Sequence, residues 1–262
     1  MSHLRAVLFD MDGTLTDTEE LWNQALHEMA LDLGGRLSAA ARAEMLGREL
    51  GEVIEMLHTE TGSRARAEDT RRGLLGKVED ALQRGTPWKP GARELLHEVR
   101  AAGLRTALVT SSPRRLVDIA TRTLGPSAFD VVICGDEIRR PKPDPEPYRV
   151  AMARLGLTAD ACVAIEDSAP GALAAERAGL PVLVAPSGGE MAVTPARTIV
   201  SSLAGQSVLS LRLILARHTA GSVVPDTAKP RSLSSYRRRR IHQTTGQLNR
   251  YPRRSGGSMI VV

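Results

Sequence analysis

The sequence predicts an α/β fold, a doubly wound parallel sheet with an all-helical block inserted after its first strand. From residue 87 onward, short apolar runs alternate with helical patterns, which is typical of parallel strands joined by right-handed crossovers. Residues 18–86 show helical patterns without a convincing strand. The first apolar run, residues 5–9, precedes that block and ends at Asp10, so its partner strands are expected much later in the chain.

The inserted block begins with an amphipathic helix. Apolar residues recur at three- and four-residue spacing across residues 17–33 and outline one helical face. Asp17 or Thr18 can cap the start of this helix, and Ser38 stands where the next helix would begin. A further helix is expected to end near Gly62, and one more follows it. The block is therefore expected to form a helical domain of its own.

The remainder of the chain is expected to build the sheet. Expected strands cover residues 104–109, 130–134, 162–165 and 181–185. Expected helices cover residues 92–102, 113–124, 145–155, 169–178 and 208–215. Ser112 precedes a proline, a favoured first-turn residue, and is expected to cap the helix at 113–124. The prediction is thus a core of residues 1–17 and 87–218, interrupted by a cap at residues 18–86.

The net charge of +5 over the 262 residues comes from the C-terminal segment. Residues 219–262 hold nine of the 35 lysines and arginines, four of them consecutive, but one of the 30 acidic residues. The preceding residues carry a net charge of −3, so the basic character says nothing about a site in the body of the protein. The segment is polar and cannot bury enough apolar surface to offset the entropy of ordering, so residues 219–262 are expected to be disordered.

The composition favours a cytoplasmic protein. No run of about 18 apolar residues is present, so no membrane span is expected. The first residues lack the apolar stretch and cleavage site of a signal peptide. Cys134 and Cys162 lie in separate apolar runs and are expected to be buried, reduced thiols.

Chemistry is predicted first at the end of the run 5–9, where Asp10 and Asp12 stand two positions apart. In open α/β sheets ligands bind beyond the carboxyl ends of the strands, so both carboxylates are expected there. One carboxylate can attack phosphorus, and a second can shuttle a proton. Taken alone, the pattern also fits an acidic turn without catalytic function. A calcium loop is disfavoured, because the twelfth position from Asp10 is Leu21 and not a glutamate.

Four motifs in this order resemble those of the haloacid dehalogenase superfamily, over about residues 4–200. The motifs are Asp10-Met11-Asp12-Gly13, Thr110-Ser111-Ser112, Lys142 between two prolines, and Glu166-Asp167-Ser168. Any one of them would be a weak signal, but together they are specific. The resemblance implies a Rossmann-like haloacid dehalogenase core with an inserted all-helical cap domain, in agreement with the fold predicted above.

The resemblance also implies a role for each motif. Asp10 is expected to be the nucleophile and Asp12 its acid/base partner. Lys142 is expected to hold Asp10 and the phosphate together, although a lysine in a loop is more often simply solvated. Thr110 and Ser111 are expected to bind the phosphoryl group, whose charge must be neutralised during transfer.

The cofactor implied by the resemblance is Mg²⁺. It is expected to be held by Asp10, the main-chain carbonyl of Asp12 and Asp167, with Glu166 assisting. A site with few carboxylates, completed by water and a substrate oxygen, suits this ion. The alternative for Glu166 and Asp167 is an acidic pair favoured by the dipole of the following helix.

Asp12 also indicates the reaction. The superfamily's dehalogenases lack an acid at this position, because a halide leaving group needs no proton. A carboxyl here predicts an alcohol leaving group, and hence hydrolysis of small phosphate monoesters, with sugar phosphates as the favoured class. The expected partner is therefore a small-molecule phosphate ester, and the protein is expected to be a monomer.

The helical block resembles the cap of the β-phosphoglucomutase-like phosphatases. Its residues 46–49 resemble the cap loop that reaches over the substrate, so Arg48 is expected to bind substrate, unless it is an exposed arginine at a helix start. Trp22 stands where the mutase has a histidine, and Leu50 where it has an arginine that grips a second phosphate. These differences favour a hydrolase, with a β-phosphoglucomutase-like phosphohexomutase as the alternative.

A nucleic-acid binder is the rival prediction from another class. The arginine run at 237–240 could bind a phosphate backbone in a salt-dependent manner. The segment around it offers two tyrosines for stacking and resembles no known fold, so a solvated tail is the expected state and nucleic acid is not expected as a partner.

Overall fold

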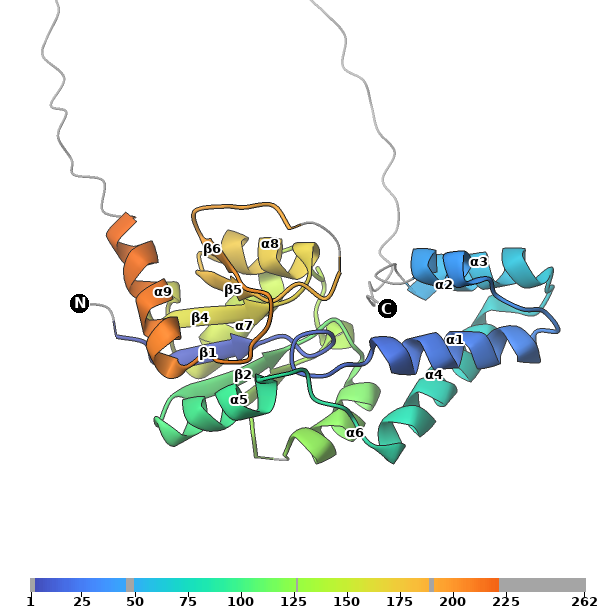
Figure 1. Ribbon diagram of the computed structural model, residues 1–262, viewed down its shortest axis with the longest axis horizontal. Coiled ribbons are helices and arrows are strands. Elements are labelled where there is room, and N and C mark those ends of the chain that lie inside the picture. Colours follow the sequence, from blue (N-terminus) through green and yellow to red (C-terminus); the bar gives the residue numbers. More distant parts are fainter. Residues whose placement is uncertain (1–2, 46–49, 126, 189–190, 222–262) are drawn as a thin grey trace, which may run out of the picture.

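The computed structural model describes residues 3–45, 50–125, 127–188 and 191–221. Its centre is a six-stranded sheet in which every pairing is parallel. The strands are β1 (Ala6–Phe9), β2 (Arg105–Val109), β3 (Val131–Ile133), β4 (Cys162–Glu166), β5 (Val182–Val184) and β6 (Arg197–Ile199). Their order across the sheet is β3-β2-β1-β4-β5-β6 (Figure 1). The predicted doubly wound parallel sheet is confirmed.

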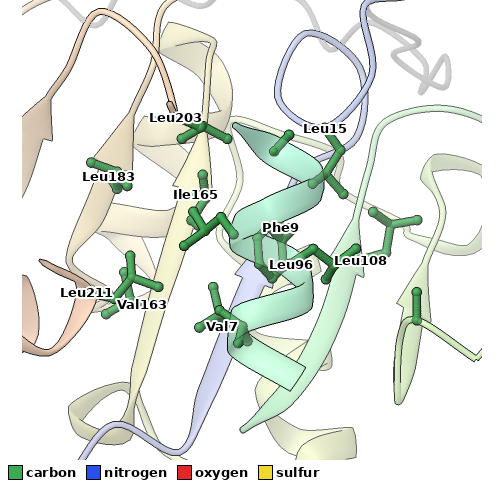
Figure 2. Packing of buried hydrophobic residues seen from close by; sticks show 14 of the residues in the cluster. Val7, Phe9, Leu15, Leu96, Leu108, Val163, Ile165, Leu183, Leu203 and Leu211 are labelled. Atoms are coloured by element: carbon green, nitrogen blue, oxygen red, sulfur yellow. The ribbon is translucent and has the colours of Figure 1, made fainter. Parts of the chain in front are cut away.

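Helices cover both faces of the sheet, because the strands carry apolar side chains on both sides. In β1, Val7 and Phe9 belong to one apolar cluster, and Ala6 and Leu8 belong to the other. The first cluster packs against α5 (Ala92–Ala101), α6 (Arg114–Leu124) and α9 (Val208–Gly221). The second packs against α7 (Glu146–Leu155) and α8 (Ala169–Arg177). Figure 2 shows the first cluster, in which Leu96 of α5 lies close to the side chains of β1.

The segment between β1 and α5 forms a group of four helices in the described residues. They are α1 (Glu19–Asp32), α2 (Ala39–Met45), α3 (Leu50–Thr61) and α4 (Ala67–Arg84), which lie beside the sheet (Figure 1). These helices pack around a third apolar cluster, which includes Trp22, Leu26 and Leu57 and also Leu116 of α6 in the core. Ser38 caps α2 as predicted, since its hydroxyl accepts the N–H of Ala41 at 3.0 Å. The predicted all-helical insertion is therefore confirmed.

The two linker segments that join the insertion to the core run side by side. The N–H of Asp17 donates to the carbonyl of Pro87 at 2.8 Å, and the N–H of Lys89 donates to the carbonyl of Leu15 at 2.9 Å. The Lys89 ammonium also lies 3.5 Å from a carboxylate oxygen of Asp17. The chain thus enters and leaves the insertion at adjacent points.

The helix caps differ from the prediction at two positions. Thr18 stands at the start of α1 but makes no capping hydrogen bond with its side chain. The cap position of α6 is occupied by Pro113, one residue after the predicted Ser112. Both hydroxyls donate instead to the carboxylate of Asp12. The carboxylate of Asp12, six residues from Thr18 and 100 from Ser112, has therefore outcompeted the capping bonds.

The C-terminal part also differs from the prediction. Helix α9 continues to Gly221, so the first residues of the segment predicted to be disordered are helical, while residues 222–262 lie outside the described residues. The edge strand β6 was not predicted, because Arg197–Ile199 is short and contains no apolar run. None of the helices in the described ranges has the length and apolar character needed to cross a membrane. Cys134 and Cys162 are buried free thiols, as predicted.

Candidate active site

The candidate active site lies at the carboxyl edge of the two central strands. The strand order reverses direction between β1 and β4, and such a switch point leaves a crevice outside the strand ends. Asp10 directly follows β1, and Glu166 and Asp167 stand at the end of β4. The N–H of Asp10 donates to the carbonyl of Ile165 at 3.0 Å, so the pairing of the two strands continues up to Asp10. The register of the sheet thus brings together carboxylates that are distant in the sequence.

Lys142 lies between these carboxylates. Its ammonium donates to Asp10 Oδ1 and Glu166 Oε1, both at 2.6 Å, and to the carbonyl of Val109 at 2.9 Å. The side chain is 4% exposed. Burial lowers the pKa of the Lys142 ammonium, but the charges of Asp10 and Glu166 outweigh it and raise the pKa above its ordinary value. The lysine therefore stays charged inside the site.

One carboxylate oxygen of Asp10 accepts a hydrogen bond, and the other has no hydrogen-bond partner. Oδ1 accepts the ammonium of Lys142, whereas Oδ2 is buried without a hydrogen-bond partner. Burial raises the pKa of the Asp10 carboxyl well above its ordinary value, Lys142 lowers it, and the charges of Glu166 and Asp167 raise it again. Buried polar atoms are rarely left unpaired, and exceptions gather where a ligand binds or reacts. Oδ2 is therefore available to a ligand.

Glu166 serves mainly to position its neighbours. It is fully buried, and its Oε1 accepts hydrogen bonds from Lys142 and from the hydroxyl of Tyr148. Its Oε2 accepts the N–H of Asp167 at 3.3 Å. Gly171 makes room for this carboxylate, since a Cβ at residue 171 would lie 2.1 Å from Oε2. Because its Oε1 already faces the Lys142 ammonium, Glu166 is a poorer direct ligand than its neighbour Asp167, whose side-chain partners are neutral hydroxyls.

Asp167 is oriented by two hydroxyl groups. Thr14 donates to Oδ1 at 3.2 Å, and Ser187 donates to Oδ2. Burial, followed by the charge of Glu166, raises the pKa of the Asp167 carboxyl to about 6. Gly13 has a φ of +85°, and a Cβ there would lie 2.1 Å from Oδ2 of Asp167. The turn after Asp12 therefore requires glycine both for its backbone and for the approach of this carboxylate.

Asp12 is held by hydroxyl groups from two parts of the fold. Ser112, after β2, donates to Oδ2 at 2.6 Å, and Thr18, at the start of the insertion, donates to Oδ1 at 2.8 Å. Thr110 donates to Oδ2 at 3.4 Å. Burial raises the pKa of the Asp12 carboxyl, and the hydrogen bonds, that of Ser112 first, lower it. A carboxyl with a raised pKa is suited to transfer protons near neutral pH.

The acidic residues fit a divalent cation. Asp10, Glu166 and Asp167 each offer a carboxylate oxygen, and these oxygens lie within 4.8 Å of one another. Oxygen donors are what hard cations such as Mg²⁺ prefer. The unpaired oxygen of Asp10 and the raised pKa values of Asp10 and Asp167 indicate negative charge that the buried lysine does not fully offset. A bound cation would offset it.

The predicted phosphate-binding residues lie beside this centre. Thr110 and Ser111 follow β2, the strand next to β1, and both are buried. The Thr110 hydroxyl accepts the N–H of Ser112 at 3.0 Å, which fixes the turn before α6. The structure thus brings together Asp10, Asp12, Thr110, Lys142, Glu166 and Asp167. Arg48, the remaining predicted site residue, lies outside the described residues.

Several residues that donate hydrogen bonds to the carboxylates of the candidate site were not predicted. Ser187 follows β5, the neighbour of β4, so the rule that ligands collect at strand ends could have found it. Thr14 lies in the turn after the two aspartates, where its hydroxyl was a recognisable candidate. Tyr148 lies in the first half of α7 and had no signal of its own, because a single tyrosine on an apolar helix face usually belongs to the core.

Fold and site together define an α/β enzyme with a buried carboxylate centre at the switch point of its sheet. Residues 4–179 match the haloacid dehalogenase-like hydrolase family. A phosphorylated carbohydrates phosphatase of Thermotoga maritima is 31% identical over 178 residues, which cover 68% of this chain and 82% of that protein. The chain therefore belongs to the haloacid dehalogenase-like hydrolase family.

Two solved structures match this chain over nearly the whole of their own length. CbbY from Rhodobacter sphaeroides, solved in complex with xylulose 1,5-bisphosphate, is 28% identical with a TM-score of 0.70, covering 79% of this chain and 99% of its own. A putative β-phosphoglucomutase from Thermotoga maritima is 26% identical with a TM-score of 0.66, covering 84% of this chain and 100% of its own. Within the family, the chain falls in the β-phosphoglucomutase-like group.

Proposed function

We propose that the protein is a Mg²⁺-dependent phosphatase of small phosphate monoesters, chiefly sugar phosphates, and that it works through an aspartyl-phosphate on Asp10. The observation that carries the proposal is the state of Asp10. One of its oxygens is fixed by Lys142 and the other is buried and unpaired, beside the hydroxyl-held carboxyl of Asp12. A carboxylate nucleophile with a neighbouring acid/base group is what two-step phosphoryl transfer requires.

In the first step, Oδ2 of Asp10 attacks phosphorus and the bond from phosphorus to the ester oxygen breaks. Asp12, whose pKa burial raises, gives a proton to the departing alcohol oxygen. In the second step, the Asp12 carboxylate takes a proton from water as that water attacks phosphorus. The bond to Asp10 breaks, inorganic phosphate leaves, and both side chains return to their starting protonation states.

The remaining residues bind and orient. Thr110 and Ser111 donate hydroxyl hydrogen bonds to the phosphoryl oxygens, and Lys142 keeps the attacking carboxylate in place. Asp10, the main-chain carbonyl of Asp12 and Asp167 would hold Mg²⁺, with Glu166 fixing the lysine beside them. When bound, the cation neutralises charge on the phosphoryl oxygens, which is the main requirement of this chemistry.

The insertion supports hydrolysis over the alternative mutase reaction. Trp22 is 3% exposed and Leu50 is 0% exposed, and both pack in the apolar cluster of the insertion. Neither can therefore supply the polar contacts that a phosphohexomutase needs to hold a sugar bisphosphate. The named phosphatase among the relatives favours the same choice, whereas the putative β-phosphoglucomutase keeps the mutase as the second candidate.

Residues 18–86 are proposed to act as a lid over Asp10, with residues 1–17 and 87–218 as the core. The support is the paired linkers at Asp17 and Lys89, which form a narrow hinge for the helices α1–α4. Movement of the helices would also have to separate α4 from α6, where Glu79 pairs with Arg115. Closure of a lid would exclude water and limit substrates to small molecules. Arg48 remains the residue proposed to select among substrates.

A cytoplasmic location is also proposed, supported by two buried free thiols. A monomer remains the proposed oligomeric state. Nucleic acid is not proposed as a partner. Salt-dependent DNA retention by the full chain, but not by a chain ending at Gly221, would overturn that view.

A phosphatase screen tests the function directly. The full chain is incubated with Mg²⁺ and a panel of small phosphate esters that includes a sugar 1-phosphate, and released phosphate and sugar 6-phosphate are both measured. Free phosphate is the expected product. Accumulation of the 6-phosphate without free phosphate would instead support the mutase, and no turnover of any ester would refute both.

A further inference from the structure

Tyr148 is a buried polar side chain that the proposed chemistry leaves without a role. It lies in the first turn of α7, is 0% exposed and packs in the second apolar cluster of the sheet. Its hydroxyl donates to Oε1 of Glu166, since a carboxylate oxygen can only accept. A phenylalanine would fill the same apolar space without a polar group to bury, so packing alone does not account for the hydroxyl.

The chain from Lys142 to Tyr148 brings both side chains to the same oxygen atom. Oδ1 of Asp144 accepts the N–H of Glu146 at 2.9 Å, which fixes the loop before α7. The Lys142 ammonium donates at 2.6 Å to Oε1 of Glu166, the atom that also accepts the Tyr148 hydroxyl. The ammonium lies over the Tyr148 ring, 5.4 Å from its centre, where a cation is attracted to the ring. Tyr148 therefore contacts both members of this buried ion pair.

Lys142 pairs with two carboxylates at once. Its ammonium lies 2.6 Å from an oxygen of Asp10 and 2.6 Å from an oxygen of Glu166, and all three side chains are buried. A second donor on Oε1 of Glu166 satisfies part of the charge of that carboxylate and so weakens its hold on the lysine relative to that of Asp10. Without the phenol, Lys142 would be the remaining donor to Oε1 among the described residues, and Glu166 would draw the ammonium away from Asp10.

The same hydrogen bond acts on the cluster of carboxylates that fits a cation. The O–H dipole of Tyr148 points its positive end at Glu166, whose carboxylate lies with those of Asp10 and Asp167. A fixed dipole of this sign opposes the binding of a cation nearby. Removing the hydroxyl should therefore tighten the binding of Mg²⁺ while it leaves the lysine less well placed. A core that is merely loosened would not bind the cation more tightly.

We propose that Tyr148 is a positioning residue of the enzyme. By donating to Glu166 it keeps the ammonium of Lys142 directed at Asp10, and it lowers the affinity of the carboxylate cluster for Mg²⁺. Its effect on the reaction passes through Glu166 and Lys142. The inference rests on the proposed phosphatase function, because it takes Asp10 as the nucleophile and Mg²⁺ as the cation.

The test compares Tyr148→Phe with the loss of another buried hydroxyl in the core. Thr106→Val is that control, because Thr106 is 0% exposed, its hydroxyl donates to the carbonyl of Ala128 at 2.8 Å, and it lies near the amino end of β2, away from the site. The affinity for Mg²⁺ is measured without substrate, from the rise in Tm as Mg²⁺ is added to the EDTA-treated protein. The kcat/KM for 4-nitrophenyl phosphate is measured at saturating Mg²⁺ for each variant.

Tyr148→Phe should lower kcat/KM by about tenfold or more, because the lysine is displaced from Asp10. It should also lower the Kd for Mg²⁺ by about threefold or more. Thr106→Val should leave both values within about twofold of the parent. In a Glu166→Gln background, Tyr148→Phe should no longer tighten Mg²⁺, since the side chain at 166 then carries no charge for the phenol to offset.

Four results would overturn the positioning role while leaving the phosphatase intact. They are an unchanged or higher Kd for Mg²⁺ in Tyr148→Phe, an unchanged kcat/KM in that variant, equal tightening in Thr106→Val, and equal tightening in the Glu166→Gln background. A parent that releases no phosphate from any ester would instead refute the phosphatase. The Mg²⁺ series would in that case still decide whether Tyr148 acts on the carboxylate cluster through Glu166.

Discussion

Replacing Lys142 by methionine removes the positive charge from a buried cluster of carboxylates. The lysine is 4% exposed and its ammonium lies 2.6 Å from an oxygen of Asp10 and 2.6 Å from an oxygen of Glu166. Breaking a buried ion pair by removing one partner costs about 3–5 kcal/mol, because the remaining charge is left uncompensated. In a chain of this size 1 kcal/mol lowers the Tm by roughly 2–4 °C, so the expected loss is about 6–20 °C. Thermal unfolding in EDTA, which keeps divalent cations out, measures it.

Lys77→Met is the matched control, since Lys77 also faces two carboxylates. Its ammonium lies 2.8 Å from Asp32 and 3.7 Å from Glu28, but all three side chains are partly exposed. Such pairs contribute about 0–1 kcal/mol, so the Tm should fall by no more than about 4 °C. Equal losses in the two variants would refute the role of Lys142 in balancing the buried charge.

The loss in Lys142→Met should also depend on pH. Burial already raises the pKa of Asp10 above its ordinary value of 3.8, Lys142 opposes that rise, and removing the lysine raises the pKa further. An aspartate whose folded pKa exceeds its unfolded value loses stability as the pH rises from the unfolded value to the folded one, because the folded state binds more protons in that window. Both proteins lose this stability up to the folded pKa of Asp10 in the parent, and the variant continues to lose it above that pKa, so the difference in Tm should grow as the pH rises beyond the parent's folded pKa. A difference that shrinks over this range would contradict the account.

Three further predictions concern the metal, the turn and the acid. EDTA should abolish phosphatase activity and Mg²⁺ should restore it, with Ca²⁺ a poor substitute because it loosens octahedral order; full activity in EDTA would exclude the metal role. Gly13→Ala should raise the Mg²⁺ concentration for half-activation by about 10–100-fold, since the new Cβ would collide with Asp167. Gly34→Ala is the control, because Gly34 has a similar φ of +83° but nothing within 4 Å of the new Cβ, and it should leave the Mg²⁺ requirement unchanged. Equal effects of the two substitutions would show that the backbone conformation alone is responsible. Ser112→Ala removes a 2.6 Å hydrogen bond that favours ionised Asp12, so the pKa of Asp12 should rise and the basic limb of kcat/KM should move up by about one to two pH units. A downward shift, or the same upward shift in Ser111→Ala, would contradict the proton role of Asp12.

Most of the fold was predictable because its signals are local. Each central strand is a short apolar run, and each helix of the core carries its own periodic pattern, so the alternation alone implies a parallel sheet. The edge strand β6 was not predicted, because its formation depends on pairing with β5. The C-terminal end of α9 was also not predicted, since the helix continues into a segment whose composition suggested disorder.

The candidate site was predictable where its residues lie at the ends of strands. Asp10, Asp167 and Lys142 follow from the motifs, and the parallel register explains why the first two lie together. The supporting hydroxyls were assigned to the wrong partners or missed. Thr18 and Ser112 have the local signature of helix caps, but their hydroxyls donate to Asp12. Ser112 lies 100 residues from Asp12, and no local pattern reports such a contact, whereas Thr18 lies six residues from Asp12 and reaches it through the turn between them.

The most direct measurement is the identity of the phosphorylated residue during turnover. The full chain is mixed with substrate and Mg²⁺, quenched in acid within the first turnovers, digested, and analysed by peptide mass spectrometry, with Asp10→Asn treated in parallel. The account predicts one phosphoryl group on the peptide that contains Asp10, none in Asp10→Asn, and a loss of activity in that variant of several orders of magnitude. A phosphoryl group on another residue, or activity of Asp10→Asn within about tenfold of the parent, would contradict it.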